Sequence, residues 1–142
     1  MHLGLSPYYL GAGTNFHALS NNEFQFFGFS IIYMDEGIDT GEIIHQSRGD
    51  FLLNDTPHSA GNRLIKKMVN QLIIILKNFN DLKLKKIQNE FYGSKVFKII
   101  DADLKSVIRL NQNFKMNLLK YLKNREKIDS NYPIIEQNLP GL

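Results

Sequence analysis

Two stretches of the chain concentrate the residue types that can carry chemistry. Residues 2–16 read HLGLSPYYLGAGTNF and place a histidine among glycines and a proline, and residues 33–46 read YMDEGIDTGEIIHQ and interleave carboxylates with glycines. The sequence contains no cysteine, which removes disulfides, thiolate nucleophiles and cysteine-ligated zinc. Any chemistry must therefore use histidine, carboxylates or backbone groups.

Together the two stretches resemble the active-site segments of the folate-dependent formyltransferases, a family that includes glycinamide ribonucleotide, methionyl-tRNA and sugar-nucleotide formyltransferases. The resemblance rests on His2, Pro7 and Gly11 in the first stretch and on the acidic loop DEGIDTG, residues 35–41, in the second. Both motifs stand in the family's order and at a fitting separation. The resemblance extends well to about residue 60, is weak up to residue 103 and is negligible beyond it.

The resemblance implies an enzyme of one-carbon metabolism that moves a formyl group from 10-formyltetrahydrofolate to the amine of a small acceptor, with a nucleotide-linked amino sugar as one candidate. Such a transfer passes through a tetrahedral intermediate, so the site must stabilise an oxyanion and move a proton between two nitrogens. Histidine can do both near neutral pH. The resemblance gives this role to His2 and makes Asp39, which directly precedes Thr-Gly, its carboxylate partner.

The acidic loop is the expected folate contact. The resemblance implies contacts from Asp35, Glu36, Gly37, Ile38 and Gly41. The two glycines can give the loop unusual backbone angles that let its amides approach a flat ring, and an ordinary turn is the alternative. Asp35 directly follows a strand and should cap the turn through its own backbone, and for Asp39 a bond to the turn's backbone remains the alternative to catalysis.

One departure from the family pattern affects the expected activity. The family carries Asn-X-His, and the Asn would fall immediately before Met1; the upstream half with its parallel strands and acceptor-binding loop is also absent from these 142 residues. Loss of one oxyanion donor lowers a rate by about 10² to 10³. We therefore expect impaired catalysis, either because the start lies at an internal Met or because the chain is a remnant. A non-catalytic interaction module and a formyltetrahydrofolate hydrolase remain alternatives.

Composition, charge and residue spacing argue against several other classes of function. The net charge of +3 comes from lysines that are spread out rather than clustered, which does not favour a nucleic-acid partner. The residues after the last expected helix are too few for the tRNA-binding barrel that methionyl-tRNA formyltransferases append. The longest apolar run, residues 72–76, is too short to cross a membrane, and no signal-peptide pattern begins the chain, so we expect a cytoplasmic protein. His17, His45 and His58 lack metal-ligand spacing, and no metal is expected.

The first half of the chain predicts an α/β fold. A short helix is expected within residues 14–19, and the aromatic run at residues 24–34 predicts a central strand covered on both faces. A second strand is expected at residues 42–46. Thr56 followed by Pro57 predicts the start of a helix that ends near Asn78. Its apolar stripe, expected to lie on the sheet, consists of Ile65, Met68, Val69, Leu72, Leu76 and Phe79.

The second half predicts fewer elements. The basic stretch up to Lys86 is ambiguous, and residues 96–100 predict a strand. Asp101 or Asp103 should begin a second helix whose stripe consists of Leu104, Val107, Ile108, Phe114, Leu118 and Leu122. We expect a mixed or parallel sheet with flanking helices, the C-terminal half of a three-layer formyltransferase domain, in residues 1–128, and an irregular tail in residues 129–142. A half-domain whose sheet lacks its upstream strands exposes a strand edge and an apolar face, which predicts self-association of the chain alone.

Overall fold

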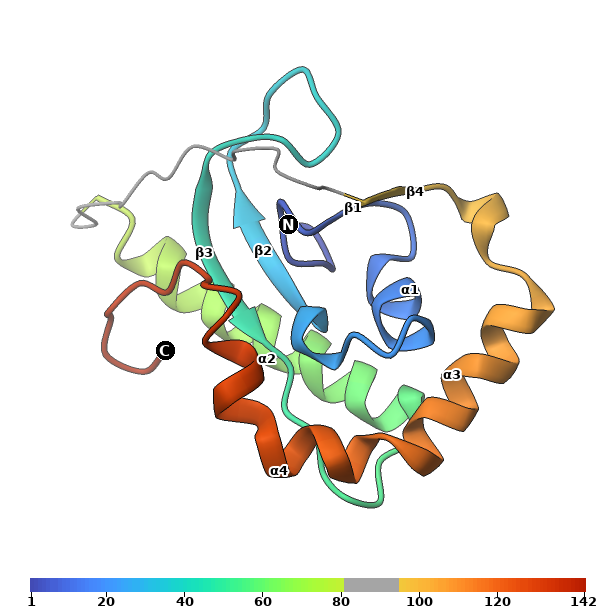
Figure 1. Ribbon diagram of the computed structural model, residues 1–142. Coiled ribbons are helices and arrows are strands. Elements are labelled where there is room, and N and C mark those ends of the chain that lie inside the picture. The colour runs from blue at the N-terminus through green and yellow to red at the C-terminus, as the bar shows by residue number, and fades with distance from the viewer. Residues whose placement is uncertain (81–94) are drawn as a thin grey trace.

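The computed structural model describes residues 1–80 and 95–142, and Figure 1 shows their arrangement. The helices and strands are β1 (Tyr9–Gly11), α1 (Thr14–Ser20), a 3₁₀ turn (Phe24–Phe26), β2 (Gly28–Ile32), β3 (Ile43–Arg48), α2 (Pro57–Lys77), β4 (Lys95–Phe97), a second 3₁₀ turn (Ile99–Asp101), α3 (Leu104–Met116) and α4 (Leu118–Asp129). Most of the ambiguous basic stretch lies outside the described residues.

The strands pair in both directions, and the α/β prediction is confirmed. β2 and β3 are antiparallel, with Ser30 opposite Gln46, and β1 and β4 are parallel. His2 forms an isolated antiparallel bridge to Ser30 on the other edge of β2. In Figure 1, α2 runs along the β2–β3 pair, while α3 and α4 form a bent arc beside α1. The core gathers buried side chains from β2, β3, α2, α3 and α4.

The expected central strand is shorter than the aromatic run that predicted it. Phe24–Phe26 forms a 3₁₀ turn, and the strand begins at Gly28. A Cβ on Gly28 would lie 2.6 Å from the Ser47 carbonyl oxygen, so a glycine is needed where β2 meets β3. The phenylalanines of the turn are as buried as those of the strand, because a buried turn and a buried strand need the same side chains.

Helix α2 begins and ends where the sequence predicts. The Thr56 hydroxyl accepts a hydrogen bond from the Ser59 amide, Pro57 occupies the first turn, and Asn78 follows the last helical residue. The stripe prediction is wrong for most of its members. The side chains that face the sheet are Ala60, Leu64, Met68, Gln71 and Ile75. The predicted Ile65, Val69, Leu76 and Phe79 are 43%, 42%, 61% and 39% exposed.

The single helix expected after residue 103 is two helices. Asp103 caps α3 by accepting from the Ser106 amide, and the chain bends at Asn117 before α4 begins. The bend lets α3 pack on α1 while α4 packs on the first 3₁₀ turn. Phe114 and Leu118 are buried as predicted, but Leu104 and Ile108 are 75% and 50% exposed.

The C-terminal tail contains no helix or strand after α4, yet it is attached to the sheet. The Gln46 amide donates to the Ile135 carbonyl oxygen at 2.6 Å, and the Ile135 side chain is buried. The tail therefore covers part of the β3 edge that β2 leaves open. None of the described helices is long and apolar enough to cross a membrane.

Candidate active site

The structure brings His2 and Asp39 together. Nδ1 of the imidazole lies 3.2 Å from Oδ2 of the carboxylate. The His2 side chain is almost fully buried, whereas that of Asp39 is 22% exposed. The pair thus has a buried histidine and a carboxylate that reaches solvent.

The backbone around His2 holds its ring on two sides. The His2 amide donates to the Ser30 carbonyl oxygen and the Ser30 amide donates to the His2 carbonyl oxygen, both at 2.9 Å. Nε2 of the ring lies 3.1 Å from the Tyr9 carbonyl oxygen. A Cβ on Gly4 would lie 2.4 Å from this nitrogen. The ring therefore needs a glycine at position 4, a requirement that the sequence did not reveal.

Asp39 reaches His2 through an unusual backbone conformation. Its φ is 57°, in the left-handed region that aspartate tolerates better than most residues. The Gly11 amide donates to Oδ2 of Asp39 at 2.9 Å, so the same oxygen faces both the amide and the imidazole. Gly11 matches the family motif, but the motif does not indicate a role for its amide. The Gly11 amide therefore orients the Asp39 carboxylate.

The two nitrogens of the His2 ring both face oxygen atoms that accept hydrogen bonds. A backbone carbonyl such as that of Tyr9 has no proton to give, and an ionised carboxylate such as that of Asp39 has none either. Each ring nitrogen therefore contacts an oxygen that can accept a hydrogen bond from it. For His2 to donate to a bound substrate, one of these two hydrogen bonds must break first.

The remaining residues of the acidic loop face their own turn or solvent. Oδ1 of Asp35 accepts from the Gly37 amide at 3.1 Å, and the Thr40 hydroxyl donates to the same carboxylate at 2.7 Å. Glu36 and Ile38 are exposed. Asp35 thus lies apart from the contact between Asp39 and His2.

The backbone-angle prediction for the two loop glycines is wrong. The positive φ in this loop belongs to Asp39, not to Gly37 or Gly41. The glycines instead allow close approach, since a Cβ on Gly37 would lie 2.0 Å from the Thr40 hydroxyl oxygen and one on Gly41 would lie 1.8 Å from the Tyr33 carbonyl oxygen. Compact folding of the loop, rather than its dihedral angles, requires them.

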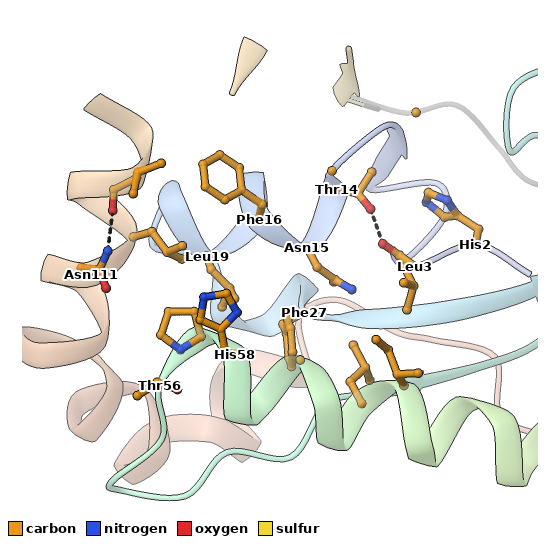
Figure 2. A pocket seen from close by; sticks show the side chains of 18 residues that line it. His2, Leu3, Thr14, Asn15, Phe16, Leu19, Phe27, Thr56, His58 and Asn111 are labelled. Atoms are coloured by element: carbon orange, nitrogen blue, oxygen red, sulfur yellow. Dashed lines mark hydrogen bonds between the residues drawn. The ribbon is translucent and has the colours of Figure 1, made fainter. Parts of the chain in front are cut away.

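A cavity of about 770 Å³ extends from His2 between α1, α2 and α3, a size typical of small-molecule sites. Figure 2 shows His2 at one end and Asn111 of α3 at the other. Apolar side chains form most of the wall: Leu3, Phe16, Leu19, Phe27, Leu64 and Ile65. No local sequence pattern indicates this cavity, because three helices distant in the chain enclose it.

Besides His2 and Asn111, the cavity has polar groups from α1 and from the start of α2. The Thr14 hydroxyl donates to the Leu3 carbonyl oxygen. The Asn15 side chain donates to the Gly28 carbonyl oxygen at 2.9 Å and accepts from the Gly28 amide at 3.0 Å. His58 lies in the first turn of α2 and is exposed. These groups provide sites for hydrogen bonds along an otherwise apolar wall.

The other two histidines are core residues with neutral rings. The His17 ring stacks on Phe97 with ring centroids 4.1 Å apart, and burial lowers the pKa of His17. Burial also lowers the pKa of His45, although a hydrogen bond with Gln71 opposes this. In the described part of the chain, no group of three or more His, Asp or Glu residues could hold a metal ion.

Comparisons with known proteins identify the family of the chain. The formyl transferase family model matches residues 1–76, and the chain belongs to that family. A methionyl-tRNA formyltransferase from Endomicrobium trichonymphae is 38% identical over 65 residues, which make up 46% of this chain and 20% of that protein.

Solved formyltransferases share the fold. The formyltransferase PseJ from Anoxybacillus kamchatkensis, in complex with UDP-4,6-dideoxy-4-formamido-L-AltNAc and tetrahydrofolate, is 27% identical with a TM-score of 0.62 over 70% of this chain and 51% of that one. An N-formyltransferase from Helicobacter canadensis, with folinic acid and dTDP-3-aminofucose, is 21% identical with a TM-score of 0.64 over 84% of this chain and 47% of that one. The chain thus spans about half the length of these structures and a fifth of that of the methionyl-tRNA enzyme.

Proposed function

We propose that this chain carries the His and Asp part of the active site of an N-formyltransferase, which transfers a formyl group from 10-formyltetrahydrofolate to the amine of a small acceptor. The contact between His2 and Asp39 at the end of the cavity carries this proposal. The attacking amine adds to the formyl carbon, the carbonyl oxygen becomes an oxyanion, and N10 of the folate leaves with a proton. The amine loses one proton and N10 gains one, so the site needs a group that moves a proton.

In the proposed reaction, His2 and Asp39 have different roles. Asp39 is partly exposed and can accept the proton of the attacking amine, directly or through water, and return it to N10 as the bond between N10 and the formyl carbon breaks. The imidazolium of His2 stabilises the oxyanion once its Nε2–H leaves the Tyr9 carbonyl. The Gly11 amide keeps the carboxylate in place while this happens.

We propose that the folate contacts the acidic loop through Asp35, Glu36, Gly37, Ile38 and Gly41, and that the acceptor is a nucleotide-linked amino sugar. Support comes from the relatives whose structures contain tetrahydrofolate or folinic acid together with nucleotide sugars. Ile38 supports the loop contact, because its side chain is 65% exposed beside Asp39 and can pack on a flat ring.

Calorimetric titration of the chain with folinic acid tests the folate contact. Ile38→Ser should weaken binding several-fold, whereas Leu52→Ser, which removes a side chain that is 61% exposed outside the loop, should not. Equal affinities of both variants and the unaltered chain would refute the loop contact. Formyl transfer to a dTDP-linked amino sugar, measured alongside formate release, separates a transferase from a hydrolase.

We propose that the 142 residues alone turn over slowly and self-associate. No Asn stands two positions before His2 within them. The α2 face with Ile65, Val69, Ile73 and Leu76 is 42% to 61% exposed and continues into the cavity wall at Ile65, which supports association through this surface.

Sedimentation velocity tests the association. A Val69→Lys, Ile73→Lys variant should shift the distribution toward monomer, and Leu104→Lys, on the 75% exposed α3 residue, should leave it unchanged. A monomeric unaltered chain would contradict self-association.

A further inference from the structure

Ser30 connects the backbone of His2 to the loop that follows it. Besides its two backbone bonds to His2, its hydroxyl donates to the Gly4 carbonyl oxygen at 2.8 Å and accepts from the Ser6 amide at 3.0 Å. The Ser30 side chain is fully buried. One residue of β2 therefore holds His2, Gly4 and Ser6 in a fixed arrangement.

Gln46 of β3 completes this set of hydrogen bonds. Its Nε2 donates to the Ser6 carbonyl oxygen at 2.6 Å and to the Ser30 hydroxyl at 2.9 Å. The hydroxyl of Ser30 thus uses its one donor and both acceptor positions. Gln46 is 1% exposed, so its hydrogen bonds are shielded from bulk water and a polar group left without its partner is costly.

The orientation of Gln46 is set by the C-terminal tail. Oε1 of Gln46 accepts from the Ile135 amide at 3.1 Å, and the Gln46 amide donates to the Ile135 carbonyl oxygen. With Oε1 bound to an amide, Nε2 must face the Ser6 carbonyl, because the reverse orientation would bring two oxygens together. The tail thereby selects which end of the side chain meets the His2 loop.

We propose that Gln46 and Ser30 are positioning residues for His2, and that docking of the tail at Ile135 holds them in place. The inference rests on the proposed function only in taking His2 as the reacting histidine. It makes the tail, which has no helix or strand, part of the support of the site. Gly4 lies against the His2 ring, so movement of the loop at Gly4 and Ser6 moves the ring.

Nuclear magnetic resonance of the unaltered chain and of four variants tests this proposal without an activity assay. Gln46→Leu, Ser30→Ala and Ile135→Pro should each shift the His2 ring signals and make exchange of the Ser6 amide proton about 3- to 10-fold faster. Ser47→Ala is the matched control: Ser47 is a buried serine beside Gln46, and among the described residues its hydroxyl bonds only to the Arg48 carbonyl oxygen, at 3.5 Å.

The outcomes separate positioning from general stability. If the melting temperature of these variants falls but the His2 ring signals stay at the unaltered position, the positioning role is wrong. If Gln46→Leu does not fold, Ile135→Pro tests the positioning role instead. This variant changes only the C-terminal tail and removes the Ile135 amide proton that Oε1 of Gln46 accepts. A failure of folinic acid binding would refute the proposed function but leave these signals interpretable, so the two failures are distinguishable.

Discussion

Oδ2 of Asp39 lies 3.2 Å from Nδ1 of His2, while Asp35, in the same loop, directs its carboxylate back to the loop. The local dihedral angle at Asp39 and the Gly11 amide account for the difference. Two acidic residues four positions apart therefore have separate environments, and substitution of each should have a separate effect.

Asp39→Asn should lower the turnover number of an active formyltransferase that contains this segment by about 10² to 10⁴, because the amide can no longer take up a proton. The fold should remain, since Asn tolerates the left-handed backbone and its oxygen can still accept from the Gly11 amide. Asp35→Asn should mainly weaken folate binding. Steady-state formyl transfer at saturating folate and acceptor measures both. A larger loss of turnover in Asp35→Asn would show that the catalytic carboxylate is misassigned.

Gly4→Ala should displace the His2 ring and lower the free energy of unfolding by about 1–3 kcal/mol, since the new Cβ would lie 2.4 Å from both the ring Nε2 and the Thr14 hydroxyl oxygen. Gly61→Ala is the matched control: its Cβ would meet no atom within 4 Å, and within α2 the change should stabilise by about 0.5–1 kcal/mol. Urea denaturation measures both. Equal stability of the two variants would contradict the close packing at Gly4.

His45 should make the tail sensitive to acid. Burial lowers its pKa, a hydrogen bond from Nε2 of His45 to the Gln71 side-chain oxygen and the charge of Glu136 oppose this, and Lys67 lowers it further. The unfolded chain therefore takes up a proton at a higher pH than the folded one. The contribution of neutral His45 is fully present above the unfolded pKa of about 6.5 and is lost as the pH falls below it. Nδ1 accepts from the Gln137 amide at 3.1 Å, a bond that protonation removes.

The measurement is the free energy of unfolding between about pH 7 and pH 5, the range in which histidine takes up a proton. His45→Gln should flatten the dependence, leaving the part due to His17, whose pKa burial also lowers. An unchanged slope in His45→Gln would refute this source of the acid sensitivity.

Asp55→Ala should destabilise the start of α2 by about 1–3 kcal/mol, because charge-assisted bonds to Arg63 are lost. The guanidinium donates at 2.8 Å and 2.6 Å, and its hydrogen bonds hold the pKa of Asp55 well below the usual range. This contribution is present above the unfolded pKa of about 3.9 and is lost as the pH falls below it. Asp50→Ala, which removes a 50% exposed carboxylate paired with Lys67, should cost about 0–1 kcal/mol. Thermal denaturation at neutral and acidic pH compares the two variants, and equal losses of stability would argue against a stabilising Asp55–Arg63 pair.

The sequence by itself determined the features that depend on neighbours within a few residues. Thr56 and Pro57 set the start of α2, since a cap bonds to amides in the next turn. The two motifs also identified His2 and Asp39 as a candidate pair before any distance between them was known. The residue types and their order along the chain match the family motifs, and this match is enough to identify the pair.

Tertiary structure alone decided which surfaces meet. Ile65 and Leu64 are neighbours with equal apolar character, yet the sheet buries only Leu64, because periodicity does not say which of two adjacent helix faces packs inward. The bend at Asn117 and the enclosure of the cavity by α3 depend on contacts between segments far apart in the chain. The support of His2 by Gln46 has the same origin. The Gln46 side chain bonds to the Ile135 amide at one end and to the His2 loop at the other, and contacts between such distant segments leave no pattern in the local sequence.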